Sequence, residues 1–365
     1  MRALVLNCGS SSLKHAVITR EGDDVDRSGG TIACEGPQAL AGAVANVLNA
    51  LDDAPDVVGH RITHGGPEHA GPVRVNLRIV DELGRLTSLA PLHMPPQLEA
   101  LAMATDALPG VPQVACFDTA FHRSMPEAAQ RLPLPRRLWD RGIRRYGFHG
   151  LVCESVVAAL GSDCPRRLVI AHLGSGASVT AVLDGQSVDT TMGMTPEGGL
   201  IMATRPGDLD PGVLLYLERE GEEDLDDMLA RRSGLLGISA RTGDMRELLA
   251  SAASDPDAAM AVEMFCRSSR RAIAGMAAML GGIDMLVFSG GIGEHSPEVR
   301  EAICGHLGFL GIDLDAAVAG VPVQVVTADE ELVIARHAMA LADAPGDPAV
   351  VQPNSSARQF NEGHG

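Results

Sequence analysis

Two short segments, far apart in the chain, combine small residues and hydroxyl groups in a way that suits phosphate binding. The first is NCGSSSLK at 7–14, and the second is HLGSGAS at 172–178. Glycine lets backbone N–H groups approach an anion closely, and serine hydroxyls add further donors. Each segment lies between two apolar stretches, which predicts a β-hairpin with a phosphate-binding turn. Because glycine and serine also form ordinary hairpin turns, one such segment alone would decide little.

The recurrence of this strand–turn–strand pattern predicts two related domains. Each would offer a phosphate loop to a cleft between them, an arrangement that suits phosphoryl transfer from a nucleotide. The length of 365 residues agrees, because it is long for a single hydrophobic core.

Charged residues follow two of the apolar stretches. Arg61 lies near the end of the stretch 57–63, and Asp118 lies at the carboxyl end of the stretch that begins at 111. In an open α/β sheet, ligands collect at such strand ends, although a surface loop and a helix cap are the alternative interpretations. His149 lies in the basic segment 131–150. The alternative interpretation of this segment is that its arginines are simply exposed to solvent.

The remaining pattern alternates strands and helices. Strands are expected in 1–18, at 57–63, from 111, in the hairpin after 167, from 283 and at 321–326, and helices at 37–51, 90–104, 212–232, 256–282 and 329–343. The stretch 283–303 is interpreted as a strand, a glycine-rich loop and a helix. The tail 344–365 is predicted to be disordered.

Composition narrows the function classes. The net charge of −18 argues against nucleic acid and anionic membranes as partners. The seven cysteines show no zinc spacing, which predicts reduced thiols in the cytoplasm. We also see no signal peptide and no apolar stretch long enough to cross a bilayer.

Taken together, a dozen segments in order from residue 4 to residue 335 resemble the acetate kinase family of the actin-like, sugar-kinase-like ATPase superfamily. They are LVLNCGSSSLK, GHRITHGG, APLHMPP, FDTAFHRSMP, YGFHG, HLGSGAS, DTTMGMTPEGGL, TRPGDLDPG, SGLLGIS, GDMR, GGIGEHS and EELVIA. The resemblance implies two duplicated actin-like (ribonuclease-H-like) α/β domains with a cleft between them. The first would span 1–120 and be completed by the helix 332–343, and the second would span 121–331.

The family's activity is reversible phosphoryl transfer from ATP to acetate, giving acetyl phosphate and ADP, with Mg²⁺ (Mn²⁺ is an alternative) in a homodimer. The resemblance implies Asp118, His149 and Arg205 as catalytic residues, and Arg61 and His93 at the substrate. It also implies a nucleotide site and a metal site. The nucleotide site would comprise Lys14, His172, Leu173, Gly174, Ser175, Gly176, Asp244, Met245, Arg246, Gly291, Ile292, Gly293, Glu294 and His295. The metal site would comprise Asn7 and Glu330.

These roles agree with the chemistry of the reaction. Transfer to a carboxylate passes through a loose transition state, so the site needs cations and positioning more than covalent chemistry. Acetate is already ionised at neutral pH and needs no general base. We therefore expect Asp118 to orient an arginine or a hydrated metal ion rather than to remove a proton.

Two departures from the family pattern fall in the nucleotide site. Ser175 and His295 stand where the family usually has asparagine, so a phosphoryl donor other than ATP and a non-catalytic relative stay open. A propionate or butyrate kinase also stays open, because one methylene changes specificity by only about 1–3 kcal/mol. An actin-like ATPase without an acyl acceptor is the distant alternative, against which GHRITHGG and FDTAFH argue.

Overall fold

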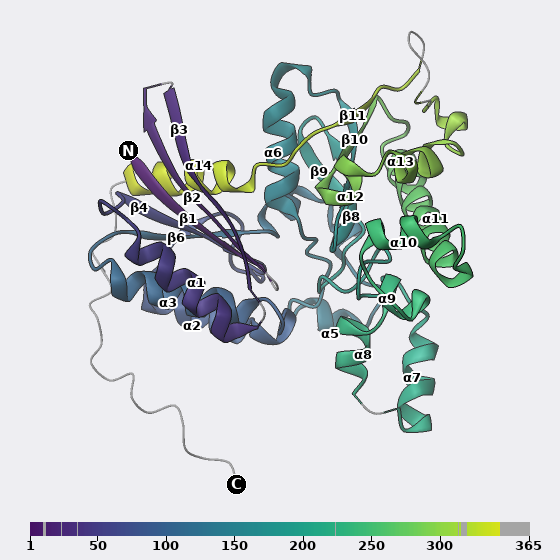
Figure 1. The fold of residues 1–365 in the computed structure, drawn as a ribbon, viewed down its shortest axis with the longest axis horizontal. Helices are drawn as coiled ribbons and strands as arrows, with labels where there is room; N and C mark the ends of the chain where they lie inside the picture. Colours follow the sequence, from purple (N-terminus) through teal and green to yellow (C-terminus); the bar gives the residue numbers. More distant parts are fainter. Residues whose placement is uncertain are drawn as a thin grey trace. The chain divides into compact units, whose positions relative to one another are not determined.

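The computed structural model describes residues 1–9, 12–22, 24–34, 36–222, 224–312, 314 and 320–343. The chain divides into two compact units: unit 1 comprises Met1–Phe117 and the chain from Glu331 onward, and unit 2 comprises Asp118–Glu330 (Figure 1). Two sequence predictions, the turn at 10–11 and the tail 344–365, lie outside the described residues.

Unit 1 is built on a six-stranded mixed sheet with the order β3-β2-β1-β4-β6-β5. The strands are β1 (Arg2–Cys8), β2 (Ser12–Glu21), β3 (Asp24–Ala33), β4 (Val57–Ile62), β5 (Val73–Arg74) and β6 (Gln113–Phe117). β1 pairs antiparallel with β2, which confirms the first hairpin, and parallel with β4. The central strands β1, β4 and β6 are mostly apolar and almost entirely buried, because helices cover both faces of the sheet.

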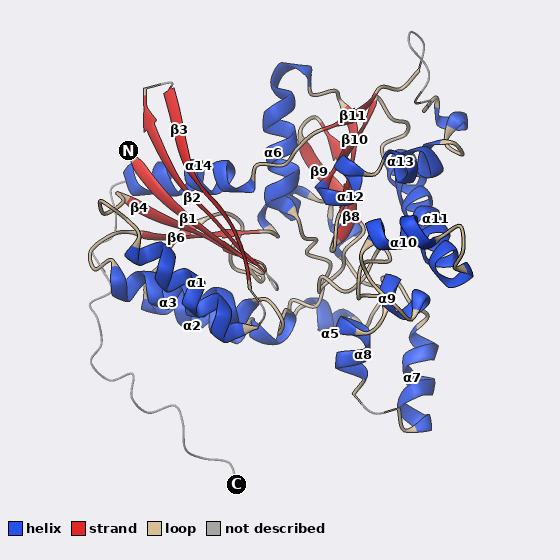
Figure 2. Cartoon of the chain, viewed as in Figure 1, coloured by secondary structure: helices blue, strands red, loops and turns tan. Residues whose placement is uncertain are grey.

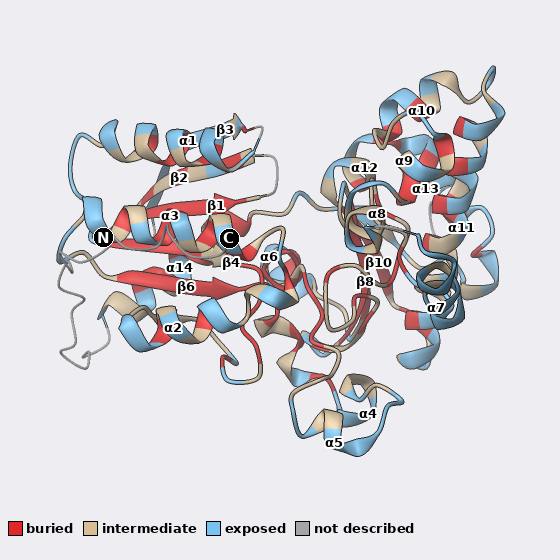
Figure 3. Cartoon of the chain, turned by 90° about the horizontal axis from the view of Figure 1, so that it is seen from below, coloured by how far each residue is buried: buried red, intermediate tan, exposed pale blue. Residues whose placement is uncertain are grey.

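The helices of unit 1 are α1 (Pro37–Asn49), α2 (Leu77–Arg85), α3 (Met94–Ala107) and α14 (Glu330–Asp343). Side chains of α1 and α3 share one buried cluster with Leu4, Leu6 and Val58. Gly59, the next residue along β4, faces the other side of the sheet, where a Cβ atom would lie 2.6 Å from Ile334 of α14. The central strands β1, β4 and β6 are accordingly buried, whereas the helices keep exposed outer faces (Figure 3).

Unit 2 repeats this plan with a five-stranded sheet of order β11-β10-β7-β8-β9. Its strands are β7 (Arg167–Leu173), β8 (Ala177–Leu183), β9 (Gln186–Thr190), β10 (Met285–Ser289) and β11 (Val323–Val325). In both sheets the first strand of the unit has its antiparallel partner on one side and a parallel strand on the other. The prediction of two related α/β sheets is confirmed.

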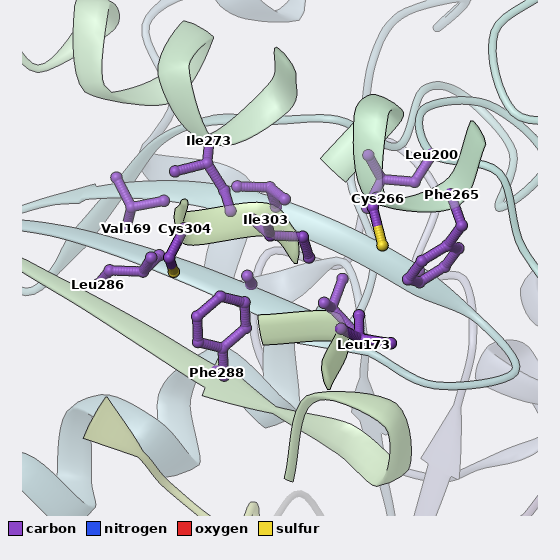
Figure 4. Close-up of a cluster of buried hydrophobic side chains, with 14 of the residues drawn as sticks. Val169, Leu173, Leu200, Phe265, Cys266, Ile273, Leu286, Phe288, Ile303 and Cys304 are labelled. Atoms are coloured by element: carbon purple, nitrogen blue, oxygen red, sulfur yellow. The ribbon is translucent and has the colours of Figure 1, made fainter. Parts of the chain in front are cut away.

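The core of unit 2 lies on both faces of this sheet. On one face, Val169, Leu286 and Phe288 pack with Phe265 and Ile303 of α11 (Pro256–Met279) and α13 (Pro297–Cys304) (Figure 4). On the opposite face, residues of α6 (Gly150–Leu160) pack against the alternate positions of β7 and β10. α11 confirms the long helix expected at 256–282.

The other helices of unit 2 are short. They are α4 (Glu127–Gln130), α5 (Arg136–Trp139), α7 (Pro211–Glu220), α8 (Leu225–Arg231), α9 (Gly234–Ser239), α10 (Met245–Ser251) and α12 (Gly290–His295) (Figure 2). α12 differs from the expected glycine-rich loop: the N–H of Gly290 donates to Glu294 Oε1 at 2.9 Å, which caps a helix that two adjacent glycines disfavour. Within the described residues, no helix is long and apolar enough to cross a membrane.

Candidate functional site

In unit 1, two predicted site residues meet at the carboxyl ends of neighbouring parallel strands. Leu6 of β1 and His60 of β4 are partners in the sheet, so the next residues, Asn7 and Arg61, lie side by side. Arg61 Nη1 donates to Asn7 Oδ1 at 3.2 Å. Arg61 is half-buried, and a planar guanidinium at a strand end is well suited to a carboxylate.

Asn7 is in turn held by Glu331, which sequence reasoning missed. Asn7 Nδ2 donates to Glu331 Oε1 at 2.8 Å, and Arg27 Nη2 lies 3.4 Å from Glu331 Oε2. Glu331 is 6% exposed and lies in the first turn of α14. The predicted metal ligand Glu330 is the preceding residue and belongs to unit 2.

A buried glutamine ties the same two strand ends together. Gln97 of α3 accepts from the backbone N–H of Thr63 at 2.9 Å and donates to the carbonyl oxygen of Cys8 at 3.0 Å. Because these residues directly follow Ile62 and Asn7, Gln97 fixes the spacing of the strand ends that carry Arg61 and Asn7. No sequence motif singled it out.

The other predicted residues of unit 1 lie near this pair or at its margin. Lys14 is exposed and is the cross-strand partner of Asn7. His93 occupies the N-cap position of α3. His60, by contrast, is buried in the sheet and bonded to Gln113 at 2.7 Å, and burial lowers its pKa to about 4, so it stays neutral.

In unit 2, two predicted catalytic side chains converge on the phosphate-loop glycine. A Cβ atom built on Gly176 would lie 2.9 Å from Arg205 Nη2 and 3.3 Å from His149 Nε2. Two donors therefore face the backbone of the turn between β7 and β8, at a place where any side chain would intrude. This geometry suits the equatorial oxygens of a phosphoryl group.

Both side chains make further contacts. His149 has φ +59°, a conformation that costs free energy for a residue with a Cβ atom, and its Nδ1 lies 3.0 Å from Ser178 Oγ. Its ring centroid is 4.7 Å from that of His172. Arg205 Nη1 donates to the carbonyl oxygen of Pro196 at 2.6 Å.

The carboxylate of Glu197 interacts electrostatically with Arg205. Burial raises the pKa of Glu197, and the charge of Arg205 opposes that shift. Burial likewise lowers the pKa of Arg205, which Glu197 partly offsets. Asp118, the third predicted catalytic residue, is 1% exposed, and its carbonyl oxygen accepts from the N–H of Gly150 at 2.7 Å. It is thus fixed to the residue after His149.

The predicted nucleotide segments of unit 2 lie next to one another. The N–H of Ala203 donates to the carbonyl oxygen of Ser175 at 3.1 Å, and a Cβ atom on Gly243 would lie 2.6 Å from the carbonyl oxygen of Ala203. On the other side of the turn, a Cβ atom on Gly174 would lie 3.9 Å from the N–H nitrogen of Gly291. The turn at 174–176 therefore has Ala203, which contacts Gly243, on one side and Gly291 on the other.

Two of these segments also have clear structural roles. Asp244 caps α10 by accepting from the N–H of Arg246, and the Arg246 side chain pairs with it at 2.6 Å, which lowers the pKa of Asp244. Glu294 accepts from Gly290 and from Thr327. Ser175 and His295 are both exposed.

The donor atoms suit a magnesium ion that arrives with nucleotide. Mg²⁺ prefers oxygen ligands and commonly binds one or two carboxylates together with substrate phosphates and water. Asn7, Glu331 and Glu330 offer such oxygens, and both carboxylates are buried. In the described part of the chain, no three His, Cys, Asp or Glu side chains gather into a group that could hold a metal ion.

Comparison with known proteins decides the family. A sequence model described as the acetokinase family matches residues 35–338. The chain belongs to the acetokinase family. The resemblance predicted from the motifs is thereby confirmed.

Individual acetokinase relatives cover most of the chain. An acetate kinase from Rhodopseudomonas palustris is 44% identical over 308 residues, which are 78% of this chain and 77% of that protein. Among solved structures, an acetate kinase from Porphyromonas gingivalis has a TM-score of 0.79 at 32% identity, covering 93% of this chain and 99% of that one. A propionate kinase from Francisella tularensis has a TM-score of 0.83 at 31% identity, with the same coverage.

Proposed function

We propose that this acetokinase transfers a phosphoryl group reversibly between ATP and acetate. The convergence of Arg205 and His149 on Gly176 carries the proposal, because it brings two donors to the glycine of a predicted phosphate-binding turn. The acetate kinases among the relatives favour acetate as the acceptor. The propionate kinase relative makes propionate the second candidate.

Each proposed site residue would have a separate role in the reaction. Arg61 would hold the acceptor carboxylate, and Arg205 and His149 would stabilise charge on the transferring phosphoryl oxygens. Asp118 would orient these donors without removing a proton, since the acceptor is already an anion. Segments 172–176, 244–246 and 291–295 would hold the nucleotide.

We infer that Asn7, Glu330 and Glu331 provide oxygen atoms for Mg²⁺. When bound, the ion would neutralise charge on the nucleotide phosphates. Within unit 1, Asn7 presents its carbonyl oxygen toward Arg61 while its amide nitrogen bonds Glu331. Substitution of Glu331 by Gln should raise the Mg²⁺ concentration needed for half-maximal activity more than the substitution of an exposed acid such as Asp140.

A hydroxylamine trap tests the function directly. The purified protein is incubated with Mg-ATP and acetate, propionate, butyrate or no acid, and acyl hydroxamate is quantified. Hydroxamate that requires an acid and is greatest with acetate supports the proposal, whereas a higher rate with propionate favours the second candidate. Release of ADP without hydroxamate would overturn the acyl-kinase function.

The homodimer and the cytoplasmic location remain proposals from the family resemblance. All seven cysteines lie in the described residues and are free thiols, which agrees with a reducing compartment. Light scattering of the purified protein tests the dimer.

A further inference from the structure

A buried hydroxyl group contacts the imidazole proposed to face the phosphoryl group. Ser178 lies in β8, is 1% exposed, and places its Oγ 3.0 Å from His149 Nδ1. It lies two residues after Gly176, at the end of the HLGSGAS segment, yet the family resemblance assigns it no role.

The strand register explains why this serine is in place. His172 of β7 and Ser178 of β8 are direct partners in the antiparallel pair, so their side chains lie on the same face of the sheet. His149 touches both of them: its ring lies against the His172 ring and its Nδ1 against the serine hydroxyl. Together with the left-handed backbone of His149, these contacts leave the ring one orientation.

The direction of this hydrogen bond decides which ring nitrogen carries the proton. A serine hydroxyl can donate or accept, whereas a neutral imidazole donates at one nitrogen and accepts at the other. If Ser178 donates to Nδ1, the proton of His149 resides on Nε2, the nitrogen that lies 3.3 Å from the Cβ position of Gly176. The opposite tautomer would aim a lone pair at a phosphoryl oxygen.

We propose that Ser178 is a positioning residue that holds His149 as the Nε2–H tautomer, so that Nε2–H is the donor to the transferring phosphoryl group. The inference rests on the proposed role of His149. Ser178 itself touches neither nucleotide nor acceptor, so its removal should change turnover and leave substrate affinity nearly intact.

The chain offers a matched control. Ser187 Oγ lies 2.9 Å from Nδ1 of His122, and both residues are buried. His122 Nε2 lies 2.8 Å from the carbonyl oxygen of Phe148, an acceptor that fixes its tautomer without the serine. Ser187→Ala therefore removes an equivalent buried bond without altering a proposed donor.

The test combines nitrogen NMR with steady-state kinetics. Protein labelled with ¹⁵N-histidine is compared as wild type, Ser178→Ala and Ser187→Ala, with His149→Gln to assign the His149 signals. Wild type should show a protonated Nε2 and an unprotonated Nδ1, and Ser178→Ala should show a mixture of tautomers. Its kcat should fall about 10- to 100-fold, the loss typical when an orienting partner of a functional histidine is removed. KM for acetate and ATP should change less than about threefold, as for a group that acts only in the transition state.

Conservative variants separate positioning from folding. Ser178→Thr keeps the hydroxyl and should restore the Nε2–H signal and most of kcat, whereas Ser178→Cys keeps the size with a weaker donor and should not. Ser187→Ala should keep the His149 signals and kcat of wild type.

Each alternative result has a distinct meaning. Unchanged His149 signals and kcat in Ser178→Ala would overturn the positioning role, as would a doubly protonated His149 in the wild type at pH 7.5. Wild-type kcat in His149→Gln would instead overturn the proposed role of His149 itself.

Discussion

Gly176→Ala should abolish most activity while leaving the fold intact. The added methyl group would lie 2.9 Å from Arg205 Nη2, 0.5 Å inside the 3.4 Å at which ordinary contacts begin, and 3.3 Å from His149 Nε2. The guanidinium is the far end of a flexible side chain and can move aside, so the free energy of unfolding should change by no more than about 1 kcal/mol. Catalytic groups must nevertheless stay within about 0.5 Å of their productive positions, so even this small shift of the guanidinium should impair catalysis.

The expected loss of turnover follows from this displacement. Removing one donor from a site that stabilises developing charge lowers kcat about 10²- to 10³-fold. Here the methyl group also occupies the space next to the turn where phosphoryl oxygens would lie. We therefore expect kcat in the acetate-dependent hydroxamate assay to fall at least about 100-fold, with a melting temperature within a few degrees of wild type.

Gly275→Ala is the matched control. Gly275 lies within α11, near its C-terminal end, and a Cβ atom there has nothing within 4 Å. The control should retain full activity and gain slightly in stability, because alanine favours a helix interior. Wild-type kcat in Gly176→Ala would refute the assignment of this turn to the phosphoryl group, and loss of folding would refute the claim that the donors can move aside.

Three further changes test other parts of the structure. Asp118→Asn should lower kcat about 100-fold and change KM for acetate less than threefold, because the residue orients donors rather than binding the acceptor. Gln97→Leu should lower the free energy of unfolding by about 2–4 kcal/mol in urea titrations, because it leaves buried backbone groups of two strand ends unpaired. The pKa of His60 and that of His122 are each lowered by burial to about 4, so acid should destabilise the protein between pH 6.5 and pH 4, by about 3 kcal/mol for each.

Protonation of these two histidines couples the free energy of unfolding to pH. Below pH 6.5 their side chains are protonated in the unfolded chain but not in the folded protein. Their contribution to stability is therefore complete above pH 6.5 and is lost as the pH falls toward 4. His60→Gln cannot titrate and should show a shallower loss over this range. An equally steep loss in that variant, an unchanged kcat in Asp118→Asn, or a wild-type urea midpoint in Gln97→Leu would each contradict the corresponding argument.

The fold was predictable wherever the sequence carried a plain pattern. β1 and β7 are runs of apolar residues that end at glycine, and α11 has a strong helical period with Asp255 as its cap. α6 gave no such signal, because it is apolar on nearly every side and has no polar stripe. The sequence predicts a loop at α12 because two adjacent glycines begin it, whereas Glu294, whose side chain accepts from the N–H of Gly290, lies beyond them.

The site was less accessible to sequence reasoning. Glu330 and Glu331 are adjacent acids whose side chains leave the helix about 100° apart, so spacing alone could not tell which one reaches Asn7. Ser178 is a small residue in a mostly apolar, buried strand, and only the register, which places it opposite His172, distinguishes it from a core residue. The meeting of Arg205 with His149 depends on two loops, whose course no periodic pattern encodes.

Helix α14 has a consequence for how the protein is made. It is the last described helix, yet it covers a sheet formed by the first 117 residues, including the Gly59 face of β4. A nascent chain therefore leaves the ribosome with one apolar face of unit 1 uncovered until about residue 343 has been synthesised, while every residue of unit 2 is already present. Unit 1, which carries Arg61, is thus the last of the two units to be completed. Premature termination before α14 would leave an aggregation-prone sheet rather than a shortened enzyme.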